Sequence, residues 1–285
     1  MTPSAAQLEA TLSDPGRRWV ILTGAGASAA SGIPTYRDRA GKWLGSEPIK
    51  HQDFIHNPHH RQRYWARSML GWPGVRDAQP NRLHKALAAF ETTGRVGLLI
   101  TQNVDRLHQQ AGSQQVVDLH GRLDRVRCLD CGAGYEREDI QQRLLAKNPQ
   151  HPRITGVVRP DGDAEIPQSA IERLAVVDCD ACGGMLMPDV VFFGGSVPKA
   201  RVAQCEQAIQ NADGVLVVGS SLQVFSGFRF ARQAKQLGKS LIIVNEGITR
   251  ADDLADLKIE QQAIAHLTEV LETISPPRSR TPAQG

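Results

Sequence analysis

Short apolar runs recur along most of the chain, separated by segments of helical periodicity. Residues 18–23 have the pattern of a buried strand, and aliphatic runs of similar length follow at 97–101, 115–119, 189–193, 214–218 and 240–244. Residues 81–90 and 200–209 carry apolar side chains at the spacing of one helix face. This alternation of strands and helices predicts an α/β fold whose parallel sheet is covered on both faces.

Two stretches interrupt the alternation and predict insertions between elements of the sheet. Residues 38–80 are polar and rich in His, Arg, Trp and Pro, and 126–185 hold four of the five cysteines. We therefore expect a large domain formed by 1–37, 81–125 and 186–274, with a helical insertion at 38–80 and a small module at 126–185.

The composition is that of an ordinary folded protein, since 41% of the 285 residues are hydrophobic and 22% are charged. The net charge of +3 is too small to indicate direct nucleic-acid binding. No apolar run approaches the roughly 18 residues that a membrane-spanning helix needs, so we expect no membrane partner. The tail 275–285 is polar and proline-rich, which predicts disorder.

The N-terminal residues lack the charged and apolar regions of an export signal. Glu9 and Asp14 precede the first arginine, whereas a mitochondrial transit peptide is rich in Arg and poor in acids. We expect a cytoplasmic protein, with the mitochondrial matrix as the alternative if the source is eukaryotic.

The cysteines give the strongest chemical signal in the chain. Cys128 and Cys131 form one C-x₂-C pair, Cys179 and Cys182 form a second, and a glycine follows each pair directly. Two such pairs supply the four thiolates of a tetrahedral structural zinc site with no open position. The alternatives are two disulfides and a redox-active C-x-x-C pair. Disulfides are disfavoured in a chain without an export signal, a redox-active pair would not need a second copy, and neither explains the duplication. The fifth cysteine, Cys205, has the setting of a core residue.

A glycine turn follows the first predicted strand. In Gly24-x-Gly26-x-x-Ala29 the first glycine permits the turn, the second allows a pyrophosphate close to the backbone, and the small third position allows close packing. A tight turn without a ligand is the alternative. The acidic residue that holds the ribose in hydride-transfer dehydrogenases, about 20 positions further on, is missing. Arg37, on a loop stiffened by Pro34, suits a phosphate clamp or a lid.

Together with these features, the residues in several segments resemble the sirtuin family. The segments are Gly24-Ala-Gly-Ala-Ser28, Ser31-Gly-Ile-Pro-Thr-Tyr-Arg37, Thr101-Gln-Asn-Val-Asp105, Leu119-His-Gly121, the two cysteine pairs, Pro188-Asp-Val-Val-Phe-Phe-Gly194 and Gly219-Ser-Ser221. They occur in the family's order over residues 15 to 270. The segments Arg61-Gln-Arg-Tyr-Trp-Ala-Arg67 and Pro160-Asp-Gly-Asp163 resemble its class II branch.

The resemblance implies a Rossmann-like NAD-binding domain, a small module with one structural Zn²⁺, and a cleft in which NAD meets an acylated lysine of a protein or peptide. It implies an NAD-dependent protein-lysine deacylase that releases nicotinamide and O-acyl-ADP-ribose. By position, His120 is the catalytic base, Gln102 and Asn103 hold the ribose, and Asp105 and Ile33 hold the departing carboxamide. Asn103 counts as a catalytic residue as well.

The resemblance also implies where the two substrates lie. The dinucleotide is expected along Gly24, Ala25, Gly26, Ala27, Ser28, Ile33, Pro34, Tyr36, Arg37, Gln102, Asn103, Asp105, Gly219, Ser220, Ser221, Asn245, Glu246, Gly247 and Ala263. The acylated peptide is expected to contact Tyr64, Arg67, Phe193, Gly194 and Val224. On this hypothesis the peptide adds as a strand between the segments 192–194 and 222–224. Gly195 stands where relatives carry an acidic residue, so a peptide contact from that side chain is lost.

The residue types suit these roles on their own terms. Histidine titrates near neutrality and can accept a proton from a hydroxyl. His120 follows a predicted strand, as do Gln102, Asn103 and Asp105, and α/β sheets place their ligands at such strand ends. A structural histidine and a satisfied polar turn are the alternatives.

The spacing Tyr64-x-x-Arg67 resembles the pair that binds acidic acyl chains in desuccinylating sirtuins. We hypothesise that Arg67 pairs with a terminal carboxylate and that Tyr64 donates a hydrogen bond to it, which favours acidic or longer acyl groups over acetyl. Packing of both side chains on one helix face is the alternative. The turn residues 159–163 could direct a loop toward the main domain.

Three other functions are compatible with the same motifs. Mono-ADP-ribosyl transfer to protein uses the same NAD chemistry with another acceptor. A non-catalytic NAD-sensing module and a dehydrogenase are further alternatives. The presence of His120, Asn103 and Asp105 argues against the non-catalytic module.

Overall fold

The large lobe is a six-stranded parallel sheet in the order β11-β10-β9-β1-β2-β3, in a computed structural model that describes residues 3–45, 48–151 and 156–275. The strands are β1 (Trp19–Thr23), β2 (Val96–Thr101), β3 (Val116–Asp118), β9 (Gly214–Val218), β10 (Ser240–Val244) and β11 (Leu257–Ile259). Strand order reverses between β1 and β9, the position where open parallel sheets bind their ligands.

The central strands are apolar because both faces of the sheet are covered. Every residue of β1 and β9 is buried. The two strands pair in parallel, with Trp19 opposite Gly214. A Cβ at Gly214 would lie 2.4 Å from the Trp19 ring, so glycine is what allows the indole to pack there.

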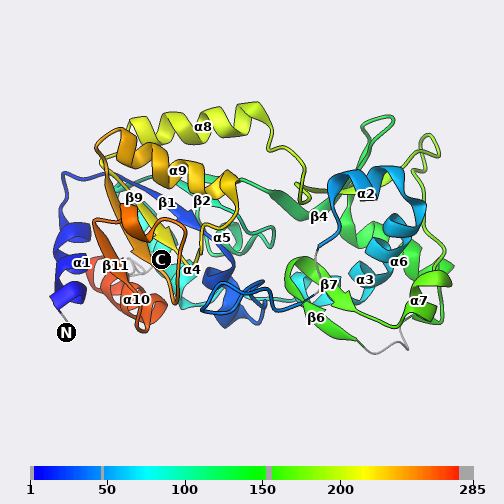
Figure 1. The fold of residues 1–285 in the computed structure, drawn as a ribbon. Coiled ribbons are helices and arrows are strands. Elements are labelled where there is room, and N and C mark those ends of the chain that lie inside the picture. Colours follow the sequence, from blue (N-terminus) through cyan, green and yellow to red (C-terminus); the bar gives the residue numbers. More distant parts are fainter. Residues whose placement is uncertain (1–2, 46–47, 152–155, 276–285) are drawn as a thin grey trace, which may run out of the picture.

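Helices cover the two faces of this sheet in separate layers (Figure 1). One face packs against α1 (Pro3–Ser13), α4 (Arg82–Thr92) and α10 (Ala263–Ile274), and the other against α8 (Lys199–Gln210) and α9 (Phe225–Gln236). The predicted helices 81–90 and 200–209 are therefore confirmed as α4 and α8. Asn81 caps α4 by accepting a hydrogen bond from the His84 backbone N–H at 3.3 Å.

The second lobe has its own antiparallel sheet and several helices. Its strands are β4 (Gly121–Cys128), β5 (Gly134–Glu136) and β8 (Leu186–Val190), in the order β5-β4-β8. Around them lie α2 (His51–His56), α3 (Pro58–Arg76), α6 (Arg137–Lys147) and α7 (Gln168–Glu172). A hairpin of β6 (Val157–Arg159) and β7 (Asp163–Glu165) encloses the 3₁₀ turn η3 (Pro160–Gly162).

One strand expectation is wrong. The apolar run 189–193 does not extend the parallel sheet, because its first residues belong to β8, which pairs antiparallel with β4. Residues 121–125 and 186–190, which we expected in the large domain, therefore lie in the second sheet. An apolar run predicts that a strand is buried, but it does not predict which strand it pairs with.

The remaining elements are α5 (Leu107–Gln110) and the 3₁₀ segments η1 (Ala25–Ser31) and η4 (Asp252–Leu254). Within the parts of the chain that the structure describes, no helix has the length and apolar character that crossing a membrane requires. The predicted disorder of the tail falls on residues 276–285, outside the described ranges; Ser275, the first residue of that tail, is described and buried.

Candidate active site and zinc centre

The glycine turn after β1 lies directly against the turn after β9. The Gly26 backbone N–H donates to the Gly219 carbonyl at 2.9 Å, and a Cβ at Gly26 would lie 2.8 Å from the Gly219 Cα. A Cβ at Gly24 would lie 2.8 Å from the Ser220 Cβ. Neither glycine leaves room for a side chain, so the sheet presents backbone rather than side chains at its switch point. This is the surface that a pyrophosphate needs.

A pocket opens beside this turn at the carboxyl ends of β1 and β2. It is lined by Ala25, Ser28, Ile33, Pro34, Val75, Asn103, Val104, Asp105 and Pro160. Six of these residues were expected to contact the dinucleotide, and the structure brings them together from three separate segments. Val75, Val104 and Pro160 were not predicted.

Three buried polar side chains form a hydrogen-bonded cluster in the pocket. The Asn103 Nδ2 donates to Ser28 Oγ at 2.9 Å and to the Gly24 carbonyl at 3.0 Å. The Ser28 hydroxyl donates to Asp105 Oδ2 at 2.6 Å. Burial raises the pKa of Asp105, while the bond from Ser28 lowers it. The cluster fixes an amide and a carboxyl group against the pocket wall, which suits the binding of a ribose and a carboxamide.

His120 lies just after β3, where the chain leaves the parallel sheet for the second lobe. Its Nδ1 is 3.1 Å from the Gln102 carbonyl oxygen, and its Nε2 is 2.7 Å from Ser226 Oγ. A carbonyl can only accept, so Nδ1 carries the hydrogen and Nε2 presents its lone pair. Burial, together with the charge of Arg201, lowers the pKa of His120 to about 4, although the bond to Gln102 raises it. The imidazole is therefore neutral at pH 7.

The position of His120 depends on the glycine that follows it. Gly121 has φ +88, and a Cβ there would lie 2.1 Å from the Asp189 carbonyl oxygen. The Val191 backbone N–H donates to the His120 carbonyl at 2.7 Å. The start of β4 is thus fixed against β8, and this holds the imidazole at the junction of the two lobes.

Gln102 connects the ends of β1, β2 and β9. Its Nε2 donates to Ser220 Oγ at 2.7 Å and to the Thr23 carbonyl at 3.3 Å. A Cβ at Gly227 would lie 2.5 Å from Gln102 Oε1, so glycine in α9 makes room for the amide. The polar side chain of Gln102, which we predicted at a ligand-binding strand end, thus lies in contact with the ends of the neighbouring strands.

Asn103 is held by a chain of hydrogen bonds through two buried threonines to a buried histidine, and the sequence analysis did not predict these three residues. The Thr101 Oγ1 accepts hydrogen bonds from the Asn103 backbone N–H at 3.1 Å and from the Thr23 hydroxyl at 2.9 Å. The His108 Nε2 lies 2.9 Å from Thr23 Oγ1, and the ring of His84 packs 4.7 Å from that of His108. Ser226 was missed as well. Only the apolar strand pattern around the threonines hinted that they are buried.

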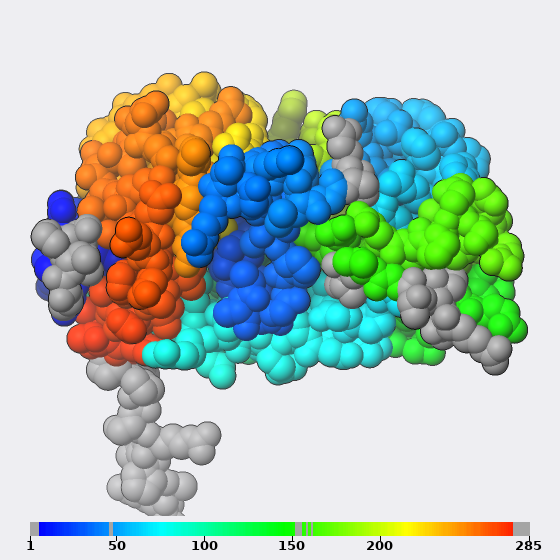
Figure 2. Space-filling view, turned by 60° about the horizontal axis from the view of Figure 1, so that its bottom comes forward, coloured from blue at the N-terminus to red at the C-terminus, as the bar shows by residue number. Residues whose placement is uncertain are grey.

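The loop after η1 lies across the front of the molecule, between the large lobe and the second lobe (Figure 2). Arg37 stacks on the Trp43 ring at 4.2 Å and donates to the Gly41 carbonyl at 2.7 Å. Tyr36 packs edge-on against Trp43 and Phe193. Arg37 is therefore held in a small aromatic cluster at the site rather than extended into solvent.

The remaining expected dinucleotide residues lie after β9 and β10 and at the start of α10. Asn245 is buried, and its Nδ2 donates to the Gly247 carbonyl at 3.3 Å. Glu246 forms an ion pair with Arg39 at 2.6 Å. The Ser221 carbonyl accepts from the Arg250 backbone N–H at 2.9 Å. Ala263 belongs to the hydrophobic core, with no exposed surface.

The β6–β7 hairpin is attached to α3 beside the pocket. The Arg67 Nε donates to the Ala164 carbonyl at 2.6 Å, and Nη2 donates to Asp163 Oδ2 at 2.7 Å. Arg67 is only 5% exposed. A Cβ at Gly71 would lie 2.3 Å from the Gly162 carbonyl oxygen, so α3 and the hairpin are in close contact. The segment 159–163 does turn back to the large domain, where Pro160 lines the pocket.

Tyr64 lies one turn before Arg67 and packs among aromatic rings. Its ring is 5.4 Å from Phe54, 5.2 Å from Trp65 and 5.3 Å from Phe192. Burial raises the pKa of Tyr64 to about 12, so its hydroxyl stays protonated.

The two segments expected to receive the peptide, 192–194 and 222–224, are loops rather than regular strands. The Phe193 carbonyl accepts from the His51 backbone N–H at 2.8 Å, and Gly194 has φ +74. Val224 is 39% exposed at the start of α9. A Cβ at Gly195 would lie 2.9 Å from the Phe192 carbonyl oxygen, which explains glycine at this position.

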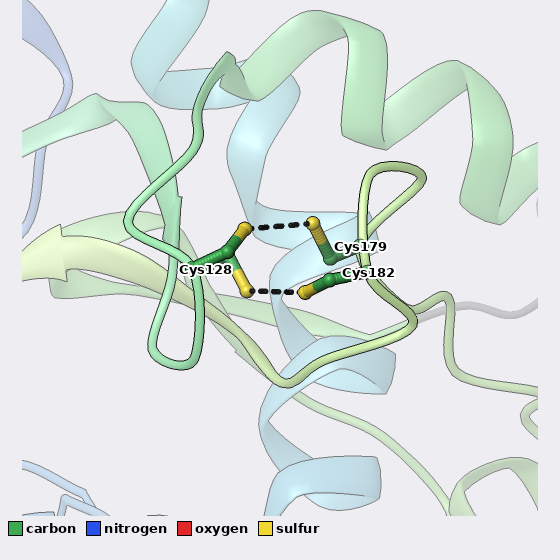
Figure 3. Close-up of side chains that lie close together, drawn as sticks. Cys128, Cys179 and Cys182 are labelled. Atoms are coloured by element: carbon green, nitrogen blue, oxygen red, sulfur yellow. Dashed lines mark hydrogen bonds between the residues drawn. The ribbon is translucent and has the colours of Figure 1, made fainter.

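The four paired cysteines converge at the end of the second lobe. Their sulfur atoms all lie within 4.8 Å of one another. Cys128 Sγ is 3.6 Å from Cys182 Sγ, and Cys131 Sγ is 3.7 Å from Cys179 Sγ (Figure 3). Four thiolates at this spacing fit a tetrahedral zinc ion with no open position. Cys205 is buried in the core between α8 and the sheet, away from this cluster.

The comparisons with known proteins agree with this geometry. The Sir2 family model matches residues 24–226. NAD-dependent protein deacetylase 2 of Bradyrhizobium diazoefficiens is 49% identical over 90% of this chain and 93% of its own. The NAD-dependent protein deacylase Sirt4 of Drosophila melanogaster is 48% identical over 84% of this chain and 78% of its own. A solved structure of Sir2 with a p53 peptide and NAD⁺ is 30% identical, with a TM-score of 0.73 over 93% of this chain and 95% of that one.

Proposed function

The chain belongs to the Sir2 family, and from this premise we propose that it is an NAD-dependent protein-lysine deacylase that favours acidic or longer acyl groups over acetyl. The relatives that it matches over most of their length are named as NAD-dependent protein deacetylases and a deacylase. These relatives support the enzyme class. The acyl preference rests on the contacts of Arg67.

The observation that carries the enzymatic assignment is the placement of His120 beside the Asn103 cluster. The dinucleotide, when bound, supplies a ribose carbon from which nicotinamide can leave. Asn103, Ser28 and Asp105 would hold the ribose and carboxamide ends in place. His120 presents an unprotonated Nε2 with which it can accept a proton from a hydroxyl group.

The zinc ion has a structural role in this proposal. The four thiolates occupy all tetrahedral positions, so no position is left for a water or a substrate. The ion would hold the ends of β4 and β8 together and so stabilise the lobe that supports α3.

The acyl preference follows from the carboxylate that Arg67 already binds. Asp163 shows that the guanidinium accommodates a carboxyl group at 2.7 Å in a nearly buried setting. The terminal carboxylate of an acidic acyl chain would replace Asp163 in this pairing. An acetyl group has nothing to offer Arg67.

A panel of acyl-lysine peptides of one sequence, incubated with NAD and analysed by mass spectrometry, tests both parts. Release of nicotinamide and of the peptide with an unmodified lysine supports deacylation, whereas addition of ADP-ribose to the peptide would mean ADP-ribosyl transfer instead. We expect Asp163→Asn to raise the ratio of glutaryl to acetyl turnover and Arg67→Ala to lower it. Each ratio comes from one protein preparation, so partial loss of folding cancels. An unchanged ratio in both variants would refute the acyl preference and leave the enzyme class intact.

A further inference from the structure

Three arginines surround one exposed aromatic ring at the start of α9. The Cζ atoms of Arg229, Arg232 and Arg250 lie 5.5, 5.4 and 6.0 Å from the centroid of Phe225. Arg250 also stacks on Phe228 at 4.4 Å. We call these five residues the α9 patch. The Phe225 side chain is 44% exposed, so its ring is accessible at the surface.

The α9 patch has positive charge without internal compensation. Among the residues that the structure describes, none of its three arginines forms an ion pair with a carboxylate. The Arg250 guanidinium donates to the Gln223 carbonyl at 3.3 Å. The nearby carboxylate of Asp252 is engaged by Lys258 at 2.7 Å. Like charges gathered around one ring repel each other, so an anionic partner would stabilise the arrangement.

The α9 patch begins next to the catalytic base. Ser226 follows Phe225 directly and lies 2.7 Å from His120 Nε2. Val224 precedes Phe225 and is exposed. A protein whose acyl-lysine reaches His120 therefore passes its neighbouring residues close to the first turn of α9. An extended chain advances about 3.3 Å per residue, so positions a few residues from the lysine come within reach of the arginines.

We propose that the α9 patch binds acidic side chains that flank the acyl-lysine of the protein substrate. This inference rests on the proposed deacylase function. Arginine forms bidentate hydrogen bonds with carboxylates, and the exposed ring provides an apolar floor for the carbon chains of Asp and Glu. Nucleic acid is the other polyanion with this chemistry. The small net charge of the chain and the position of the α9 patch beside a lysine-binding site favour a protein substrate over nucleic acid as its ligand.

The test uses the acyl group that the wild-type protein removes fastest in the panel above. It compares acyl-lysine peptides that carry either Glu or Gln at the positions two to five residues before and after the lysine. We expect the wild-type protein to process the acidic peptide with a kcat/KM three- to tenfold higher, and this ratio to approach one in 0.5 M NaCl because salt screens exposed charges. The Arg229→Gln/Arg232→Gln variant should also bring the ratio close to one. The matched Lys85→Gln/Arg173→Gln variant removes the same charge elsewhere and should keep the ratio of the wild type.

Equal turnover of acidic and neutral peptides by the wild-type protein overturns the inference, as does a ratio that survives in the Arg229/Arg232 variant. Binding of a fluorescent single-stranded oligonucleotide that depends on Arg229 and Arg232, without any preference among peptides, overturns it in favour of nucleic acid. If no peptide of either kind is deacylated, the proposed function itself fails, which is a distinguishable result.

Discussion

At the scale of single residues, the surroundings of His120 determine its state of protonation. The Gln102 carbonyl fixes the tautomer, and burial disfavours the imidazolium, so that the pKa falls to about 4. The consequence for catalysis can be measured, because protonation of Nε2 removes the lone pair to which the proposed mechanism assigns the substrate's proton.

We expect kcat/KM for an acylated peptide to stay nearly constant from pH 8 to about pH 5 and to fall only as the pH approaches 4. The His120→Gln variant should lose roughly 10²- to 10⁴-fold in kcat, the usual contribution of a general base. Stopped assays across this range, with circular dichroism at each pH to follow folding, make the measurement. The exposed His56 provides a control, since His56→Gln should keep the activity of the wild type. An acid limb centred near pH 6.5 would contradict the low pKa of His120.

At the scale of elements, the zinc centre joins two chain segments that are far apart in the sequence. Cys128 is the last residue of β4 and Cys131 follows it, whereas Cys179 and Cys182 precede β8, so the ion would close the open end of the second sheet. The sulfur atoms lie close together without any other cross-link among the described residues.

We expect one zinc per chain by plasma mass spectrometry and none in Cys179→Ser. Loss of the ion should lower the melting temperature by about 10 °C or more, because metal binding contributes directly to folding of such modules. Cys205→Ala is the matched control. Burial raises the pKa of the Cys205 thiol to about 12, so it is a poor ligand and its removal should leave the zinc content at one. Full zinc content in Cys179→Ser would rule out the four-thiolate site.

The contact between α3 and the β6–β7 hairpin permits a second test at this scale. An added methyl group in Gly71→Ala would meet the Gly162 carbonyl oxygen, so the hairpin must move and carry Pro160 away from the pocket. We expect kcat/KM to fall at least tenfold while the zinc content stays at one. Gly134→Ala is the control, since nothing lies within 4 Å of its Cβ position and its φ is not positive. Wild-type activity in Gly71→Ala would show that the hairpin position does not affect the pocket.

Features that depend on neighbouring residues were predictable from the sequence, and features that depend on distant pairing were not. The glycine turn, the polar strand ends and the cysteine pairs are each contained in a few consecutive residues. In contrast, β8 could be recognised as a buried strand but not assigned to β4, and β6 and β7 have only three residues each. The contact of Ser226 with His120 joins positions 106 residues apart, and no local pattern indicates it.

At the scale of the whole molecule, the candidate active site forms where the two lobes meet. The large lobe contributes the glycine turns and the Asn103 cluster, and α3 and the hairpin of the second lobe contribute Val75 and Pro160. His120 lies on the connection between the two sheets. Neither lobe contains a complete pocket, so the activity depends on the packing of one lobe against the other.

Packing of the large lobe also buries ionisable groups that make its stability depend on pH. His84 and His108 are almost fully buried against each other, and burial lowers the pKa of both, that of His84 to about 4. In the unfolded chain a histidine titrates near pH 6.5. Between pH 6.5 and pH 4 the unfolded state therefore binds more protons than the folded state, and the free energy of unfolding falls as the pH falls. The carboxyl groups of Asp105, which is buried, and Asp163, which is partly buried, have raised pKa values and act in the opposite direction.

A variant isolates the contribution of one histidine from these opposing groups. We expect the wild-type protein to lose roughly 2 kcal/mol of unfolding free energy through His84 alone between pH 7 and pH 5, from the difference between its folded and unfolded pKa values. In His84→Leu the same pH change should cost about 2 kcal/mol less, even though the variant starts from a lower stability because Asn81 loses a partner. Urea denaturation at the two pH values measures both numbers. His56→Gln, which removes an exposed histidine, should show the pH dependence of the wild type; a His84→Leu variant with that same dependence would mean that His84 is protonated in the folded protein.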